Sequence, residues 1–178
     1  SDSVRKNIEN NRGKDIGMEG VLFDKMDRLH TLRVHSDNKV LGPDNDDAIT
    51  AQYSVANMAG KNRCKSHFAR KFGLKKNPLV TFIGDLDANS GIDLVNDILD
   101  DLMDRDISLL IVGKGNATYN HAIESWKNEF AGNIAWINEI PAEDKIRRIL
   151  SAADILLIPA KDDRNLHTLA MRYGCIPV

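Results

Sequence analysis

The feature that most limits the fold of this chain is a series of short apolar runs that do not alternate with polar residues. The runs are "PLVTFIG" (78–84), "ISLLIVG" (107–113), "NIAWI" (133–137), "ILLIP" (155–159) and the start of another, "CIPV" (175–178). Strands buried on both faces read in this way, whereas half-buried strands alternate. The sequence therefore predicts a parallel sheet that is covered by helices on both faces.

Segments with helical periodicity lie between these runs. Phe68 and Phe72, for example, are four residues apart and would share one helix face. The helices are expected within 60–74, 91–103 (as one helix), 118–132, 142–154 and 164–174. Regular alternation of strand and helix predicts an α/β fold with a doubly wound parallel sheet, of the Rossmann type.

The pattern of polar and apolar residues changes near residue 58. Residues 1–58 are polar and are expected to form an arm or linker, with residues 59–178 as the Rossmann-like domain. Within the arm, "GPDNDDA" (42–48) is expected to be an exposed loop. The arm is expected to pack on the domain only through four apolar residues: Val21, Leu22, Met26 and Leu29. Because the sequence stops at Val178, just after a strand has begun, we expect a truncation or a fragment.

Composition excludes several classes of protein. A formal net charge of −2 and a pI near 6.2 argue against broad affinity for nucleic acid or a membrane surface. No apolar run approaches the roughly 18 residues of a membrane span, and residues 1–16 lack the apolar core of a secretory signal. Cys64 and Cys175 show no metal-type spacing, which favours a reduced compartment in which both thiols pack as apolar groups.

The stretch "FIGDLDANSGIDLV" (82–95) has the layout of a phosphate-binding loop: an apolar strand, a glycine, a short loop and a helix that opens at Gly91. Such loops hold an anion with backbone amides at a helix N-terminus. Here the loop contains Asp85 and Asp87 and no Lys or Arg. The shape therefore suits an anion, whereas the charge opposes one.

Other candidate sites have structural alternatives that we favour. "VGKGN" (112–116), with Lys114, reads better as a turn than as a phosphate loop. Two further interpretations are that Asp85 and Asp87 bind a metal and that the basic helix near Arg63 contacts an anionic partner. The first lacks a full ligand set, and acids elsewhere offset the charge of the second. Core or surface roles are also favoured over catalysis or sugar stacking for His35, His167, Trp126 and Trp136.

Several motifs in order resemble bacterial glycogen synthases and plant starch synthases. The motifs are "GMEGVLFDKMDRLHT" (17–31), "LGPDNDDAITAQYSVANMAGKNRCKSHFARKFGL" (41–74), "FIGDLDANSGIDLV" (82–95), "AEDKIRRILSAADILLIPA" (142–160) and "TLAMRYGCIPV" (168–178). The third of these motifs is similar to the family's "FVGRLVEQKGIDLL", and the last motif is similar to the family's "LYALRYGTIPV". The resemblance runs from about Gly17 to Val178.

The resemblance implies the donor-type, C-terminal half of a GT-B glycosyltransferase, an enzyme that transfers glucose from ADP-glucose or UDP-glucose to an α-1,4-glucan. It implies an intracellular protein of the cytoplasm or the plastid stroma, with no cofactor and no metal. The positions that correspond to the family's donor site are Gly84, Asp85, Ser90, Gly91, Pro141, Lys161 and His167.

At several of these positions the sequence departs from the family. Asp85 stands where the family has a phosphate-binding Arg, Ser90 where it has a Lys, and Pro141 where it has an aromatic residue near the base. The segment "KDDRNLHT" (161–168) is shorter than the family's donor loop and lacks its acid-Pro-Cys-Gly core. We therefore expect a catalytically inactive binding or scaffolding module in glucan metabolism, with weak binding of nucleotide sugar or glucan, or a protein partner.

Two alternatives stay open. The chain could be the donor-binding half of a working glucosyltransferase that needs a separate acceptor domain, or a structural domain with no ligand. Simultaneous loss of the Arg, the Lys and the donor-loop core disfavours the first of these.

Overall fold

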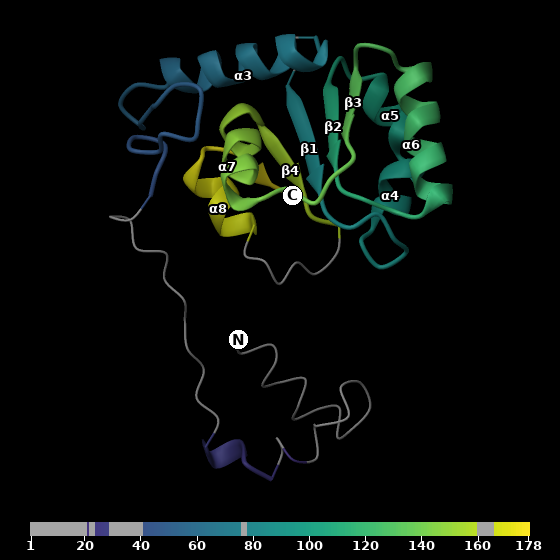
Figure 1. The fold of residues 1–178 in the computed structure, drawn as a ribbon, viewed down its shortest axis with the longest axis horizontal. Helices are drawn as coiled ribbons and strands as arrows, with labels where there is room; N and C mark the ends of the chain where they lie inside the picture. The colour runs from purple at the N-terminus through teal and green to yellow at the C-terminus, as the bar shows by residue number, and fades with distance from the viewer. Residues whose placement is uncertain (1–20, 22–23, 29–40, 76–77, 160–165) are drawn as a thin grey trace. The chain divides into compact units, whose positions relative to one another are not determined.

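The computed structural model describes residues 21, 24–28, 41–75, 78–159 and 166–178 (Figure 1). The chain divides into two compact units, residues 1–40 and residues 41–178. In the first unit, a 3-10 turn, η1 (Met26–Arg28), closes with a hydrogen bond from the Arg28 amide to the Lys25 carbonyl oxygen (2.9 Å). Val21 is 55% exposed, and Leu22 and Leu29 lie outside the described residues. Packing of the arm through these residues therefore stays a prediction. The expectation that residues 1–58 pack only through them was wrong, because Ile49 and Tyr53 are buried in the core of the second unit.

The second unit contains a five-stranded parallel sheet in the order β3-β2-β1-β4-β5. The strands are β1 (Leu79–Ile83), β2 (Ser108–Val112), β3 (Ile134–Ile137), β4 (Ile155–Leu157) and β5 (Ile176–Pro177). Each matches an apolar run of the sequence. The predicted doubly wound α/β fold is confirmed.

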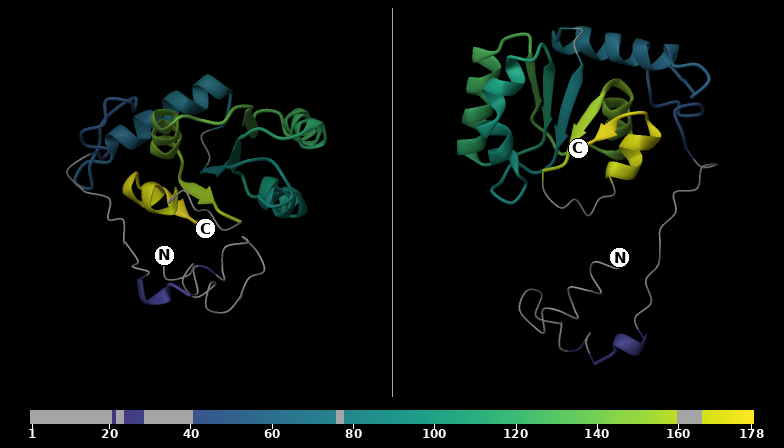
Figure 2. Two further views of the ribbon diagram at one scale, coloured as in Figure 1. Left: turned by 60° about the horizontal axis from the view of Figure 1, so that its bottom comes forward. Right: turned by 180° about the vertical axis from the view of Figure 1, so that it is seen from behind.

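The helices form two layers, one on each face of the sheet (Figures 1 and 2). One layer consists of α4 (Ile92–Asp97), α5 (Leu99–Met103) and α6 (Ala117–Glu129). The other consists of α3 (Ala59–Phe72), α7 (Glu143–Ala152) and α8 (Leu166–Arg172). The change of face occurs between β3 and β4, which α7 connects.

Alternate residues of the central strands pack into two separate hydrophobic cores, one on each face of the sheet. In β1, Leu79 and Ile83 contribute to the core under α3, α7 and α8, whereas Val80 and Phe82 contribute to the core under α4, α5 and α6. All five residues of β1 and of β2 are buried. Burial on both faces is the reason that these strands read as unbroken apolar runs.

The segment 91–103 is two helices, so the prediction of one helix was wrong. Ile98 separates α4 from α5, with φ −110° and ψ 9°. Leu99 and Met103 are buried, as Ile92 and Val95 are, while Ile98 is 45% exposed. The helix that follows the candidate phosphate loop is therefore only six residues long.

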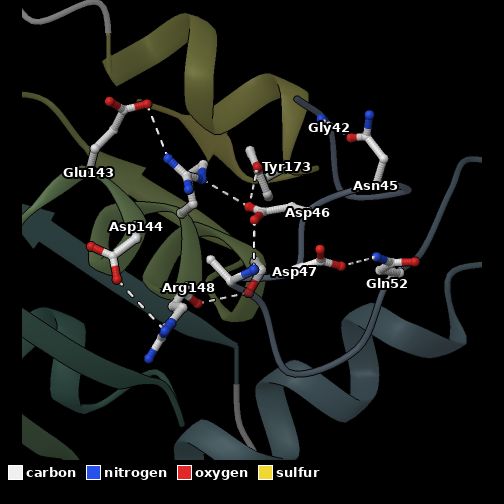
Figure 3. A network of polar contacts seen from close by, with 12 residues as sticks. Gly42, Asn45, Asp46, Asp47, Gln52, Glu143, Asp144, Arg148 and Tyr173 are labelled. Carbon is white, nitrogen blue, oxygen red and sulfur yellow. Dashed lines mark hydrogen bonds and ion pairs between the residues drawn. The ribbon is translucent and has the colours of Figure 1, made fainter. Parts of the chain in front are cut away.

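Segment 41–58 packs within the second unit through a buried polar network (Figure 3). Asp46 is 1% exposed and accepts hydrogen bonds from the Tyr173 hydroxyl (2.6 Å), Arg147 Nε (2.9 Å) and the Ala48 amide (2.8 Å). Burial alone would raise the pKa of Asp46, but the hydrogen bonds and the charge of Arg147 hold that pKa below its usual value. The expectation that "GPDNDDA" is exposed was wrong for Asp46, because these donors replace the lost water.

Lys61, at the start of α3, is also buried, although in the sequence it is one cation among several of a basic helix. It is 7% exposed, and Nζ donates to the carbonyl oxygens of Tyr173 (2.8 Å) and Ala153 (2.9 Å), with those of Leu150 and Ser151 at 3.3 and 3.5 Å. Burial lowers the pKa of this ammonium. The carbonyls belong to the C-terminal ends of α7 and α8, where a cation complements the helix dipole.

Candidate functional site

The topology of the sheet indicates where a ligand site lies. The connections from β1 lead through α4 and α5 on one face, whereas the connection from β4 leads to α8 on the other. β1 and β4 are neighbours in the sheet, so their carboxyl ends diverge into loops on opposite sides. Ligands of open α/β sheets bind at such a switch point. The loop 84–91 and Pro159 lie at this edge.

Close backbone contacts fix the shape of this edge. Gly91 has φ +78°, and a Cβ there would lie 2.7 Å from Pro159 Cβ. A Cβ on Gly113, at the end of β2, would lie 1.8 Å from the Gly84 carbonyl oxygen. The Leu86 amide also donates to the carbonyl oxygen of Lys114 (2.9 Å). The loops that follow β1, β2 and β4 are thus packed together, and only glycine fits at these contacts.

Side chains of the loop 84–91 accept hydrogen bonds from backbone amides of the same loop and of the residue after it. The Asp87 carboxylate accepts hydrogen bonds from the amides of Asn89 and Ser90 (2.9 Å each). Ser90 Oγ accepts from the amide of Ile92 (3.3 Å) and donates to the carbonyl oxygen of Asp87 (2.8 Å). In an anion-binding loop such amides point at the ligand. Here the loop's own carboxylate and hydroxyl already bind amides of this kind.

Carboxylates dominate the charge around the loop. Asp85 and Asp87 are exposed on it, and Asp93, in the first turn of α4, accepts a hydrogen bond from the Tyr119 hydroxyl (3.1 Å). Partial burial and this bond raise the pKa of Tyr119. Lys114 is exposed on the neighbouring loop. The edge therefore carries more negative than positive charge among these residues.

The site positions expected from the resemblance lie on four segments. Gly84, Asp85, Ser90 and Gly91 share the loop after β1, and His167 is exposed in the first turn of α8. Pro141 lies between β3 and α7, and β2 separates β3 from β1 in the sheet. Lys161 lies outside the described residues. The structure thus brings the loop residues together, while their role as donor contacts stays a prediction.

The two tryptophan candidates pack against the protein. Trp136 is half-buried, and its Nε1 donates to the Gly113 carbonyl oxygen (3.1 Å); Trp126 packs against the core beneath α6. His35 lies outside the described residues. Where the structure describes the chain, it contains no group of three or more His, Cys, Asp or Glu residues that could hold a metal ion.

Sequence reasoning missed two features of the edge. The contact between Gly91 and Pro159 joins positions that are far apart in the sequence, and no local pattern signals it. The turn closed by Asp87 does have a local signal, since Asp commonly accepts a hydrogen bond from the amide two residues later. Its consequence for ligand binding follows only from the observed hydrogen bonds.

Comparison with known proteins supports the resemblance. A family model for glycosyl transferases group 1 matches residues 65–164, and the chain therefore belongs to this family. Soluble starch synthase 1, chloroplastic/amyloplastic, of Solanum tuberosum is 30% identical over 169 residues, which cover 91% of this chain and 26% of that protein. Glycogen synthase of Bacillus licheniformis is 32% identical over 168 residues, which cover 90% of this chain and 34% of that protein.

Solved structures show the same fold. The catalytic domain of starch synthase IV from Arabidopsis thaliana, bound to ADP and acarbose, superposes with a TM-score of 0.77 at 20% identity, over 90% of this chain and 34% of that one. The C-terminal domain of a glycosyl transferase group 1 family protein (LpcC) from Francisella tularensis has a TM-score of 0.53 at 13% identity. This match covers 66% of this chain and 63% of that one. These similarities confirm the expected resemblance to the C-terminal GT-B domain of glycogen and starch synthases.

The chain spans about a quarter to a third of the length of the curated relatives named above. Across the described residues, no helix has both the length and the apolar character that a bilayer span needs.

Proposed function

We propose that this chain is a donor-type domain of the glucan-synthase kind that does not catalyse glucose transfer by itself and that binds nucleotide only weakly. The observation that carries the proposal is the loop after β1. Its amides at Asn89 and Ser90 are bonded to the Asp87 carboxylate, and Asp85 is exposed beside them. A donor diphosphate would have to displace one carboxylate from the amides and approach another.

The electrostatic term has the wrong sign for a diphosphate. Two unit charges about 4 Å apart interact by about 1–4 kcal/mol at the dielectric constants of a protein surface. With Asp85 in place of a cation this term is repulsive. The N-terminus of α4 offers little compensation, because the helix has six residues and Ser90 Oγ already accepts a hydrogen bond from the Ile92 amide.

The role that fits a weak donor site is that of a binding or scaffolding module in α-1,4-glucan metabolism. The ligands that we propose are a nucleotide sugar or a glucan, supported by the starch synthase structure bound to ADP and acarbose. A protein partner is a further proposal. Relatives that include chloroplastic or amyloplastic starch synthases and bacterial glycogen synthases support a location in the plastid stroma or the bacterial cytoplasm.

The alternative is a working donor half that uses ADP-glucose or UDP-glucose together with an acceptor domain on another polypeptide. Lys114 favours it, since this cation is exposed on the loop whose backbone bonds to Leu86 of the candidate site. On this alternative the chain would bind ADP firmly, and an added acceptor domain would restore transfer.

Calorimetric titration with ADP, ADP-glucose and a malto-oligosaccharide tests the proposal, together with a radiolabelled assay of glucose transfer to glycogen. We expect no transfer and weak ADP binding by the wild-type chain. Asp85→Arg should raise the affinity for ADP at low salt by about tenfold, because reversing one charge is worth more than 1 kcal/mol. The matched control is Asp97→Arg, an equal charge change at an exposed residue of α4.

Transfer at the rate of an intact synthase would refute the proposal, and tight ADP binding would favour the alternative. If Asp85→Arg and Asp97→Arg change the affinity equally, the loop is not a nucleotide site. In that case the third hypothesis, a structural domain without a ligand, would replace both.

A further inference from the structure

The charge of this chain is unevenly distributed along the sequence. Residues 48–84 contain seven Lys and Arg and no Asp or Glu, whereas the remaining residues contain 17 Lys and Arg against 26 Asp and Glu. The whole chain is slightly acidic, so this stretch is a local basic region on an acidic background. Most of its cations lie in α3.

The structure separates the cations of α3 into two groups. Lys61 is buried against backbone carbonyls, and Lys65 forms an ion pair with Asp154. Arg63, Arg70 and Lys71 are exposed instead. Within the part of the chain that the structure describes, Arg63 and Arg70 form no ion pair, and the ammonium of Lys71 lies 5.4 Å from the centre of the Phe72 ring.

The exposed cations share one side of the helix. Arg63, His67 and Arg70 follow one another at spacings of four and three residues, which places them on one face, and Lys71 lies at the edge of that face. From Arg63 to Lys71 this face extends for about 12 Å, at 1.5 Å per residue. Cys64, Phe68 and Ala69 of the same helix are buried in the core. The basic face is therefore held rigidly toward solvent.

We propose that this basic face of α3 is a docking surface for an acidic segment of a partner polypeptide. Two unpaired arginines favour carboxylates, because a guanidinium can bind a carboxylate with two parallel hydrogen bonds. The face is as long as about two helical turns and no longer, which suits a short acidic segment. A nucleic acid is disfavoured, since its extended backbone would also meet the acidic remainder of the chain.

The surface lies away from the candidate nucleotide site. Lys65 of α3 binds Asp154, which precedes β4, and the Asp154 carboxylate also accepts a hydrogen bond from the Leu79 amide at the start of β1. α3 thus crosses the amino ends of the strands, whereas the loop 84–91 follows their carboxyl ends (Figures 1 and 2). A partner bound to α3 would leave the candidate site open, as a scaffolding role requires.

Poly-L-glutamate is the probe that tests the proposal, by titration at 20 and 200 mM NaCl monitored by fluorescence anisotropy. We expect binding by the wild-type chain at the lower salt that weakens by about tenfold at the higher salt, because exposed charges are screened. The variant Arg63→Glu, Arg70→Glu, Lys71→Glu should lose binding by tenfold or more. The matched control, Lys127→Glu, Lys145→Glu, Arg148→Glu, makes the same change of net charge on α6 and α7 and should bind like wild type.

Circular dichroism and thermal melting of both variants will show whether they are folded. A folded control variant that loses binding as completely as the α3 variant would reduce the effect to net charge and overturn the proposal. Absence of binding to poly-L-glutamate at 20 mM NaCl would also overturn it. Tighter binding of a single-stranded oligonucleotide, lost in the α3 variant, would assign the face to nucleic acid instead.

Discussion

Asp46 offers the sharpest test of how this domain is held together. In Asp46→Ala, the buried donors from Tyr173, Arg147 and the Ala48 amide lose their acceptor. Removing one partner of a buried ion pair costs about 3–5 kcal/mol. The lower end applies here, because the Arg147 side chain is 14% exposed and keeps an ion pair with Glu143 (3.1 Å). We expect Asp46→Ala to lower the free energy of unfolding by about 3 kcal/mol.

Urea unfolding at pH 7 measures this loss, with Asp46→Asn and Asp47→Ala as companions. Asp46→Asn keeps one acceptor oxygen and should cost about 2 kcal/mol, the value of a hydrogen bond to a charged group. Asp47 is exposed and accepts a bond from Gln52 Nε2 (3.1 Å), so Asp47→Ala should change stability by less than about 0.5 kcal/mol. If Asp46→Ala and Asp47→Ala cost the same, the network does not anchor segment 41–58.

The dependence on pH has a definite sign. The folded-state pKa of Asp46 lies below its unfolded value, so the folded state favours the ionised carboxylate. The stabilisation is therefore fully present above the unfolded pKa of about 3.9 and is lost as the pH falls through the folded pKa. The difference in stability between wild type and Asp46→Asn should be constant from neutral pH to about pH 5 and should shrink below about pH 4. A difference that grows on acidification would contradict the assigned direction.

Two other predictions concern single positions. Gly113→Ala should destabilise the domain by about 3 kcal/mol or more in urea unfolding, since its Cβ would lie 1.8 Å from a backbone oxygen. Gly73→Ala is the comparison: there is open space around its Cβ but φ is +68°, so this variant should cost only about 1 kcal/mol. Cys64 and Cys175 are buried free thiols, and burial raises the pKa of Cys175 to about 12. Ellman's reagent at pH 8 should therefore find both thiols only after denaturation, and rapid labelling of the native chain would contradict their burial.

The sheet could be predicted from the sequence because burial on both faces leaves a local signature. Every residue of β1 and β2 is buried, and the runs that encode them contain few polar residues. The helices were predicted for the same reason, since one face of each meets a core. The break at Ile98 was not predictable from spacing, because the apolar positions on either side of it fit one continuous helix.

The polar network was beyond sequence reasoning for a different reason. Asp46 and Tyr173 are 127 residues apart, and the acidic cluster around Asp46 reads locally as a solvated loop. Lys61 likewise reads as one cation among several in a basic helix. Burial of a charge depends on partners that only the folded chain brings together. Local patterns therefore predict the apolar core and miss the buried ions that connect its elements.

The shape and the charge of the loop 84–91 have separate causes, and substitutions can separate them. Gly91 is required by packing, because a Cβ would lie 2.7 Å from Pro159 and φ is +78°. Gly91→Ala should therefore lower the free energy of unfolding by about 2–3 kcal/mol, whatever the loop binds. Asp85 is exposed, and Asp85→Arg should change stability by less than about 0.5 kcal/mol.

Urea unfolding of the two variants, beside ADP titration, compares these effects directly. A stable Asp85→Arg with increased ADP affinity would mean that folding maintains the loop's shape while its charge is free to vary. Ser90→Lys is less suitable for this purpose, since it removes the hydroxyl that the Ile92 amide and the Asp87 carbonyl bind. If Asp85→Arg instead destabilises the domain as much as Gly91→Ala does, then Asp85 has a structural role, and its carboxylate is no evidence for the loss of a donor site.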